Sequence, residues 1–234
     1  MTRPWAERLL AVFFPNRCAY CGEVVAYPDR LCAACEADLP LISPPACPDC
    51  GRARTDCVCQ HHRHPYDLVL SPFYYRGVVR RALLRLKAAE RPATVRELAA
   101  RMLRRFVQSG HPLPDGVTYV PMTRRDERDR GYNQSRLLAA EIADGLQLPL
   151  IDGLRKVQQT RPQKGLTALE RSGNVLGAFD AAPGTDLSGK TLLLIDDLVT
   201  TGATAGECAK VLKLYGAEKV ILLAAAVDPP RKQK

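Results

Sequence analysis

The stretch Leu192–Thr204 constrains the fold of this chain more than any other. Its four apolar residues Leu192–Ile195 come directly before two adjacent carboxylates, Asp196 and Asp197, and a Thr/Gly turn and a helical pattern follow. A short continuous apolar run is typical of a parallel strand buried on both faces. Open α/β sheets bind their ligands at the carboxyl ends of such strands. The stretch therefore predicts a parallel α/β sheet with a ligand site at this strand end.

The turn after the carboxylates offers backbone N–H groups at a helix N-terminus, which suit a phosphate group. Hydroxyl donors and a glycine strengthen this prediction, and the predicted phosphate-binding residues are Thr200, Thr201, Gly202, Ala203 and Thr204. The two carboxylates would lie beside the phosphate, where ribose hydroxyls or a magnesium ion could bind. We therefore expect a sugar-phosphate site. The alternative is an ordinary strand, turn and helix in which Thr204 and Glu207 form a capping box.

Eight of the nine cysteines lie between positions 18 and 59, as three Cys-x-x-Cys pairs and one Cys-x-Cys pair. Paired thiolates from tight turns are typical ligands of tetrahedral zinc. Two structural zinc ions with four sulfurs each would use Cys18, Cys21, Cys32, Cys35, Cys47, Cys50, Cys57 and Cys59. The pairs could fill the sites sequentially or interleaved, and His61, His62 or His64 could replace one sulfur. The alternative is a disulfide framework, which needs an oxidising compartment.

The N-terminal residues do not resemble a signal peptide. Residues 1–14 contain Arg3, Glu7 and Arg8, and their apolar run is too short. No stretch approaches the ~20 apolar residues of a membrane span. We therefore expect a cytoplasmic protein with reduced cysteines and no membrane insertion. Cys208 stands alone on a later helical pattern and is expected in the hydrophobic core.

Composition divides the chain into an N-terminal module, residues 1–65, and a larger domain, residues 66–234. Basic and acidic side chains balance in the first part, with seven of each, whereas the second carries 27 basic and 18 acidic ones. The module begins with a predicted amphipathic helix over Trp5–Phe14. It is too small to bury a useful core, so metal must supply much of its folding free energy.

Strands are expected to alternate with helices in the larger domain. The predicted strands cover 67–75, 117–120, 192–195 and 218–227, and the predicted helices lie before Pro92, over 94–106 and over 135–146. Such alternation is typical of a parallel α/β sheet. The sequence Thr94–Glu97 is typical of a capping box at the start of the second helix.

Basic side chains are concentrated in residues 76–105, which hold ten basic and two acidic residues. Helical periodicity places apolar residues such as Val79 and Leu83 on one face. The opposite face carries Arg80, Arg81, Arg85, Lys87 and Arg91. This face is either a solvated helix surface or a binding site for single-stranded nucleic acid.

Two polar loops are expected beside the carboxylate pair. The first follows the strand at 117–120 and carries Arg124 and Arg125, which could present guanidinium groups to a pyrophosphate. The second runs from Arg155 to about Gly177 and has few apolar anchors. Loops of this length are usually functional lids or unstructured insertions.

Together these features resemble the ComF family, in which a cysteine-rich zinc module precedes a type I phosphoribosyltransferase-like domain. The resemblance covers nearly the whole chain. It rests on the cysteine pairs, Tyr75-Arg76-Gly77 with Leu84–Lys87, Val120-Pro121, Arg130–Gln134, Arg161-Pro162-Gln163 with Arg171 and Asn174, and the Asp-Asp loop. It implies a parallel sheet flanked by helices, a small zinc-ribbon module, and binding of phosphoribosyl pyrophosphate (PRPP) with magnesium. It also implies partners in natural competence, namely single-stranded DNA and other DNA-uptake proteins.

The leading hypothesis is therefore a ComF-type protein that binds PRPP or a related ribose phosphate and acts with DNA during uptake. If it transfers a ribosyl group, Asp196 and Asp197 are the predicted catalytic pair. Thr200 stands where some purine-salvage relatives carry a third acidic residue, so no general base is evident there. The alternatives are a metabolic phosphoribosyltransferase acting on a small base or amine, with zinc purely structural, and a non-catalytic scaffold.

Overall fold

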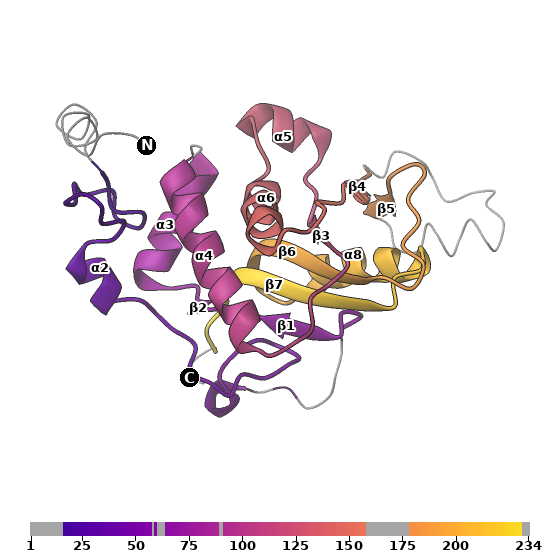
Figure 1. The fold of residues 1–234 in the computed structure, drawn as a ribbon, viewed down its shortest axis with the longest axis horizontal. Coiled ribbons are helices and arrows are strands. Elements are labelled where there is room, and N and C mark those ends of the chain that lie inside the picture. The colour runs from indigo at the N-terminus through magenta and orange to yellow at the C-terminus, as the bar shows by residue number, and fades with distance from the viewer. Residues whose placement is uncertain (1–15, 58, 60–63, 89–90, 158–177, 231–234) are drawn as a thin grey trace.

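A parallel β-sheet forms the centre of the molecule (Figure 1). The computed structural model describes residues 16–57, 59, 64–88, 91–157 and 178–230. The sheet has five strands in the order β1–β7–β6–β3, and β2 pairs with β7 beyond β1. The strands are β1 (Leu68–Leu70), β2 (Phe73–Tyr74), β3 (Gly116–Tyr119), β6 (Thr191–Val199) and β7 (Lys219–Val227). The predicted fold class, a parallel α/β sheet, is confirmed.

The central strands β6 and β7 are buried on both faces, as their apolar runs predict. Successive side chains of a strand point to opposite faces of the sheet. Accordingly, Leu193 and Ile195 of β6 belong to one hydrophobic cluster, while Leu192 and Leu194 belong to a second. The strands pair in register, with Leu193 opposite Ile221. The uninterrupted apolar run in β6 therefore supplies both halves of the core.

Different elements cover the two faces of the sheet. One face packs against α3 (Gly77–Ala88), α4 (Pro92–Gln108) and α6 (Gln134–Leu146). The other packs against α8 (Ala203–Leu214) and an antiparallel pair, β4 (Leu154–Lys156) and β5 (Phe179–Ala181). The strand β4 includes Arg155 and Lys156, the first two residues of the second predicted loop, so that loop starts later than expected.

Prolines explain two further differences from the predicted elements. The strand expected over 67–75 is split into β1 and β2 around Ser71 and Pro72, because proline has no N–H to donate to a neighbouring strand. The capping box predicted at Thr94–Glu97 is wrong. Helix α4 starts earlier, with Pro92 in its first turn, where the missing N–H costs nothing. Thr94 instead donates its hydroxyl to the carbonyl of Ala19, at 2.7 Å.

The first cysteine-rich segment packs against α3 and α4. Tyr20 is fully buried and meets the ring of Phe73 edge to face, with 6.2 Å between centroids. Glu36 of the short helix α2 (Ala33–Ala37) forms an ion pair with Arg101 of α4, at 2.9 Å. Cys18 and Cys35 belong to the same hydrophobic cluster as these helices. This segment is therefore part of the main core.

The second cysteine-rich segment packs on the other face of the sheet, also near the carboxyl end of β7. Arg52 donates its Nε to the carbonyl of Asp228, at 2.8 Å, and the N–H of Ala53 bonds the hydroxyl of Tyr74, at 3.0 Å. The short helix η1 (Arg54–Asp56) follows. The division at residue 65 stays a prediction, but both segments share contacts with the sheet domain.

Several predicted features lie outside the described residues. They are the helix over Trp5–Phe14, the histidines His61 and His62, and residues 158–177 of the second polar loop, including Arg161, Gln163, Arg171 and Asn174. No helix in the described part of the chain is long and apolar enough to cross a membrane.

Candidate functional site

The carboxylate pair lies near the carboxyl end of β6, at the sheet edge where α/β folds bind ligands. Asp196 is 7% exposed, and its Oδ1 accepts hydrogen bonds from the hydroxyl of Ser135, at 3.2 Å, and from the N–H of Asp197, at 2.9 Å. Ser135 belongs to the first turn of α6. The strand continues to Val199, so both carboxylates are held by regular backbone and not by a loop.

Burial is the largest cause of an unusual pKa at Asp196. Loss of water and the adjacent charge of Asp197 raise this pKa from 3.8 to about 8, although the two hydrogen bonds and Lys87 oppose the shift. Two neighbouring carboxylates with little water around them disfavour a second negative charge. A cation between them would relieve that repulsion, so the pair is chemically suited to bind one.

Lys87 provides such a cation within the chain. Its Nζ lies 2.9 Å from Oδ2 of Asp197. Sequence periodicity placed Lys87 on the outer basic face of α3, but it lies at the last turn of the helix and its long side chain reaches the end of β6. The structure therefore brings Lys87 to the carboxylate pair. Arg85, from the same predicted face, donates to the carbonyl of Tyr20 at 3.3 Å.

A cleft of about 240 Å³ surrounds the carboxylate pair. Three basic and three acidic side chains line it. Its polar lining consists of Lys87, Arg130, Lys156, Asp126, Asp196, Asp197, Asn133, Gln134, Ser135 and Thr204. These residues come from α3, α5 (Arg124–Arg130), α6, α8 and the strands β4 and β6. Segments far apart in the sequence thus meet at one end of the sheet.

Gln134 carries a buried donor in this cleft. The side chain is 4% exposed, and its Oε1 accepts a hydrogen bond from Nη1 of Arg130, at 2.9 Å. Because a guanidinium group can only donate, this bond fixes which end of the amide is oxygen. The Nε2 group makes no hydrogen bond with any described residue. Leaving a buried donor unpaired costs ~1–3 kcal/mol, so an acceptor atom of a ligand would be favoured here.

The turn after β6 has the geometry expected of a phosphate loop. Gly202 has φ of +76°, a left-handed conformation that favours glycine, and it precedes the first residue of α8. No described side chain caps this helix. The alternative capping box is not formed, since Glu207 pairs with Lys210 at 2.6 Å. Thr204 lines the cleft, whereas Thr200 and Thr201 are exposed beside it.

The predicted pyrophosphate ligands Arg124 and Arg125 are outside the cleft. Both are exposed on α5, where Arg125 forms an ion pair with Asp129 at 3.8 Å. Arg124 lines a separate depression with Glu127 and Arg128. From the same helix, Arg130 is the arginine that reaches the cleft. Its place in the donor-rich stretch 128–134 was the signal that could have identified it.

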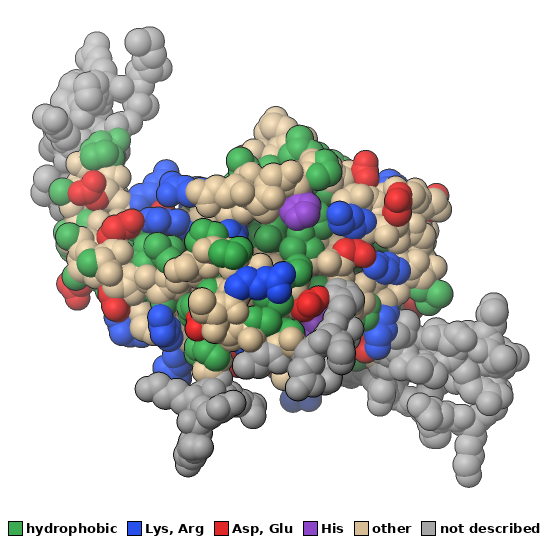
Figure 2. All heavy atoms as spheres, turned by 90° about the horizontal axis from the view of Figure 1, so that it is seen from below, with side chains coloured by type: hydrophobic (Ala, Val, Ile, Leu, Met, Phe, Trp, Pro, Cys, Tyr) green, Lys and Arg blue, Asp and Glu red, His purple; other side chains and the backbone are tan. Residues whose placement is uncertain are grey.

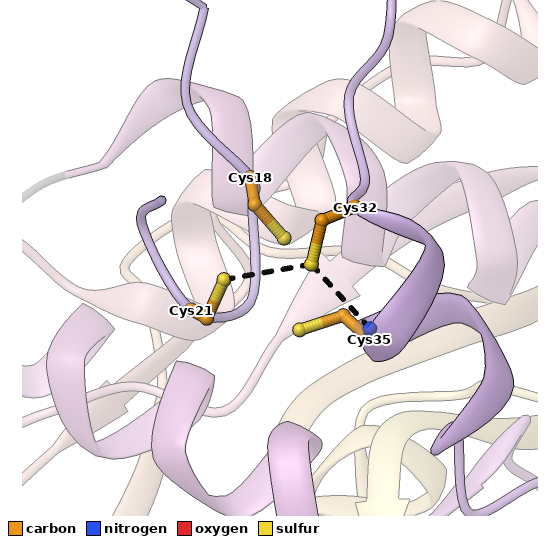
Figure 3. Close-up of side chains that lie close together, drawn as sticks. All are labelled: Cys18, Cys21, Cys32 and Cys35. Atoms are coloured by element: carbon orange, nitrogen blue, oxygen red, sulfur yellow. Dashed lines mark hydrogen bonds between the residues drawn. The ribbon is translucent and has the colours of Figure 1, made fainter. Parts of the chain in front are cut away.

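The eight clustered cysteines form two separate groups of four, and each group uses two pairs that follow each other in the sequence. Within each group the four Sγ atoms lie within 4.8 Å of one another, and the groups are Cys18, Cys21, Cys32, Cys35 and Cys47, Cys50, Cys57, Cys59. Figure 3 shows the four sulfurs of the first group converging. Sulfur pairs at 3.7 Å and 3.8 Å match the ~3.8 Å edge of a tetrahedron with Zn–S bonds of ~2.3 Å.

The protonation of Cys18 also suits a metal ligand. Burial opposes its ionisation, but bonds from the backbone N–H groups of Cys21, Cys32 and Tyr20 outweigh this and lower its pKa to about 6. Cys208 of α8 is fully buried and lies outside both groups, as predicted. His64 is not a member of either group. The described residues thus supply two four-cysteine zinc-binding clusters.

The predicted nucleic-acid face is only partly accessible. Arg80, Arg81 and Arg91 are exposed, whereas Arg85 and Lys87 make the internal contacts given above. On the face of the molecule drawn in Figure 2, the described basic side chains are interspersed with acidic and apolar ones. That face has no continuous basic surface among the described residues. Binding of nucleic acid stays a prediction.

Two family models match the chain. The double zinc ribbon domain matches residues 9–67, and the phosphoribosyl transferase domain matches residues 133–234. The first range contains both four-cysteine clusters, and the second contains the carboxylate pair and the phosphate loop. The models therefore agree with the arrangement of the two parts of the fold.

Curated relatives match over most of their length. Competence protein F from Haemophilus influenzae is 28% identical over 231 residues, covering 89% of this chain and 95% of that protein. DNA utilization protein YhgH from Salmonella typhi is 30% identical over 222 residues, covering 92% of each. Competence protein ComFC from Bacillus subtilis is 26% identical over 194 residues, covering 79% of this chain and 78% of that protein.

Solved structures give weaker matches. Glutamine PRPP amidotransferase from B. subtilis is 23% identical, with a TM-score of 0.39, and the match covers 55% of this chain and 25% of that one. A crystal structure of adenine phosphoribosyltransferase is 14% identical, with a TM-score of 0.37, and the match covers 59% and 80%.

Proposed function

Because this chain belongs to the ComF family of competence and DNA-utilization proteins, we propose that its carboxylate cleft binds PRPP or a related ribose phosphate together with magnesium. We further propose that the protein acts with single-stranded DNA, and with other proteins of DNA uptake, in natural competence. Zinc bound at each cluster would have a structural role, because four thiolates would leave no open coordination position.

One observation carries this proposal, namely the position of the two carboxylates next to an uncapped helix N-terminus. The carboxylates lie at the carboxyl end of β6, and Gly202 lets the backbone turn directly into α8. A phosphate bound at the first turn of α8 would have the carboxylates beside it. Lys87, Lys156 and Arg130 would offset the negative charge of further phosphate groups.

Magnesium fits the donor set of the cleft. Carboxylate oxygens are preferred ligands of this ion, which is usually held by one or two carboxylates together with substrate phosphates. Asp196 and Asp197 supply two carboxylates, and the ammonium group of Lys87 already lies against one of them. When bound, magnesium would neutralise phosphate charge and polarise the pyrophosphate group. We expect Lys87 to move from Asp197 toward the ligand phosphates on binding.

A ribosyl transfer at this site would break the bond between the anomeric carbon and the pyrophosphate oxygen, whose electron pair leaves with the pyrophosphate. A lone pair of the acceptor would form the new bond, and the proton carried by the acceptor atom would pass to solvent. Asp196 and Asp197 would then hold the ribose beside the phosphate and stabilise positive charge that develops on its ring. The donors of Arg130 and Gln134, which line the same cleft, would orient oxygen atoms of the ligand.

Thermal denaturation tests ligand binding directly. With PRPP and magnesium at ~100 times the dissociation constant, the free energy of unfolding should rise by ~2.7 kcal/mol. The stabilisation should require both ligands and should be lost in a variant carrying Asp196→Asn and Asp197→Asn. Glu218→Gln is the matched control, because Glu218 is exposed next to the amino end of β7, away from the cleft. No stabilisation of the native protein at millimolar PRPP would contradict the proposal and favour a scaffold.

A further inference from the structure

We propose that the second zinc cluster sets the conformation of the phosphate loop, with Tyr66 as the positioning residue between them. The inference rests on the proposed function only in treating the turn Thr200–Gly202 as the phosphate loop. It concerns the segment His64–Asp67, which leaves the second cluster and enters the sheet at β1. The first zinc cluster has no such connection among the described residues.

Tyr66 lies between the zinc cluster and the loop. Its side chain is fully buried, and its hydroxyl lies 3.5 Å from the carbonyl of Asp49, in the turn between Cys47 and Cys50. Burial, followed by the charges of Cys50 and Cys59, raises the pKa of this hydroxyl. The phenol is therefore packed against the metal-binding turn itself.

The other side of Tyr66 meets the backbone of the phosphate loop. A Cβ atom at Gly202 would lie 2.5 Å from the Tyr66 hydroxyl, closer than packed atoms allow, and 3.0 Å from the ring of His64, a tight contact. The two rings are stacked with 4.8 Å between centroids and 14° between planes. This stack forms a wall against Gly202, so its position limits where the loop backbone can go.

Neighbouring contacts hold the same segment on α8 and β7. Pro65 lies so close to Gly206 of α8 that an added Cβ would meet it at 3.2 Å. Asp67 forms an ion pair with Lys213 of α8, at 2.9 Å, and accepts a hydrogen bond from the N–H of Val220, at 2.8 Å. Asp67 thus fixes the segment to α8 and β7, and the contact of Tyr66 with Asp49 fixes it to the turn of the second zinc cluster.

The two zinc clusters therefore differ in what they can influence. The first cluster contacts α3 and α4, through the carbonyls of Ala19 and Tyr20. The second reaches the loop through Asp49, Tyr66 and Gly202. Four thiolates without metal repel one another when charged, so the Asp49 turn would loosen and the ring stack would lose one of its supports. The loop N–H groups would then be less well oriented for a phosphate.

Hydrogen exchange of the full-length protein tests this coupling without any ligand. Cys59→Ser removes one ligand of the second cluster at an exposed position, and Cys21→Ser is the matched change in the first cluster. We follow the amides of residues 206–209, the first hydrogen-bonded turn of α8, because the N–H of Gly206 bonds the carbonyl of Gly202 in the loop, at 2.8 Å. We expect their exchange to become at least about tenfold faster in Cys59→Ser and to stay within about twofold of the native protein in Cys21→Ser, with one zinc lost in each. Equal effects of the two variants would overturn the proposal.

Tyr66→Phe separates the positioning role from zinc loss. It removes only the hydroxyl between Asp49 and Gly202. The variant should retain two zinc ions, and hydrogen exchange of the same amides should still become severalfold faster. An unchanged exchange rate of these amides in this variant would contradict a role for the Tyr66 hydroxyl. PRPP affinity, measured in parallel, should fall in Cys59→Ser and Tyr66→Phe but not in Cys21→Ser. If the native protein binds no PRPP, the proposed function fails, while the exchange experiment still decides the coupling.

Discussion

The buried carboxyl group of Asp196 should make the free energy of unfolding depend on pH. Its raised pKa arises first from burial and then from the charge of Asp197. Between its ordinary pKa of 3.8 and the folded value of about 8, the folded protein holds a proton that the unfolded chain releases. The free energy of unfolding must therefore fall as pH rises through this window, by up to about 1.4 kcal/mol per pH unit, and level off above it.

Asp196→Asn should remove this pH dependence in magnesium-free buffer. The amide keeps an acceptor for the Ser135 hydroxyl but carries no charge, so the variant should be more stable than the native protein above pH 8 and similar to it near pH 4. Denaturant titrations at several pH values measure the effect. Glu218→Gln should follow the native curve. A native protein that gains stability between pH 5 and 8 relative to Asp196→Asn would refute the raised pKa.

The amide of Gln134 makes a second prediction at this scale. Its Nε2 is a buried donor that makes no hydrogen bond with any described residue, whereas its Oε1 accepts one from Arg130. Gln134→Leu should therefore lower the free energy of unfolding by no more than about 1 kcal/mol, the usual net contribution of that one bond. If a ligand acceptor pairs with this donor, the same variant should lose ~1–2 kcal/mol of PRPP binding, or about five- to thirtyfold in affinity. Parallel unfolding and binding measurements check the contrast. If the variant binds PRPP as tightly as the native protein, no acceptor atom of the ligand pairs with Nε2 of Gln134.

At the scale of elements, β6, β7 and α6 could be predicted because their apolar patterns are long and regular. The residues of the site were harder to predict, because they depend on which long side chains reach the cleft from distant elements. Periodicity put Lys87 with Arg80 on one outer face, yet Lys87 lies at a helix end and contacts Asp197. Similarly, Arg124 and Arg130 follow the same strand, but only Arg130 reaches the cleft. The two arginines lie nearly two helical turns apart, at opposite ends of α5, and local sequence does not show how this helix is oriented.

The exposed arginines of α3 allow a prediction about the salt dependence of DNA binding. Arg80 and Arg81 are exposed and make no ion pair with any described residue, whereas Arg85 supports the zinc module through Tyr20. If single-stranded DNA binds this face, changing Arg80 and Arg81 to Ala should flatten the log–log salt dependence of binding by about 1.4, or ~0.7 for each lost phosphate contact. Folding should be unaffected, because the apolar face of α3 is unchanged.

Binding titrations across a range of salt concentrations measure this slope. Arg85→Ala serves as the contrast, since it should lower the free energy of unfolding and leave the salt slope nearly unchanged. If the Arg80/Arg81 double variant binds DNA with the native slope, this helix face is only a solvated surface. The DNA site, if present, would then have to be sought on α5 or elsewhere in the chain.

At the scale of the whole molecule, the zinc module and the sheet share one core. Tyr20, Cys18 and Cys35 pack in the same cluster as α3, α4 and the sheet. The module's two four-cysteine clusters could be predicted from sequence. Its packing could not, because Tyr20 and Thr94 are distant in sequence and carry no pattern that pairs them. Metal removal should therefore affect more than the cysteine-rich residues.

Elemental analysis should find two zinc ions per chain, because two separate groups of four cysteines are formed. A strong chelator should lower the unfolding temperature of the sheet domain by at least about 5 °C, corresponding to roughly 1–2 kcal/mol for a chain of this size. The physical reason is that loosening the first cluster exposes the buried faces of α3 and α4. Loss of both ions with no change in the unfolding of the sheet would show that the module is energetically independent.

Calorimetric titration of PRPP into the full-length protein tests the central claim most directly. In the presence of magnesium we predict binding near one ligand per chain. In the variant carrying Asp196→Asn and Asp197→Asn, the affinity should be at least about 100-fold weaker, or ~2.7 kcal/mol, and Glu218→Gln should bind like the native protein. Equal affinity for PRPP in the native protein and the double variant, or no binding to the native protein, would contradict the assignment of this cleft as a ribose-phosphate site.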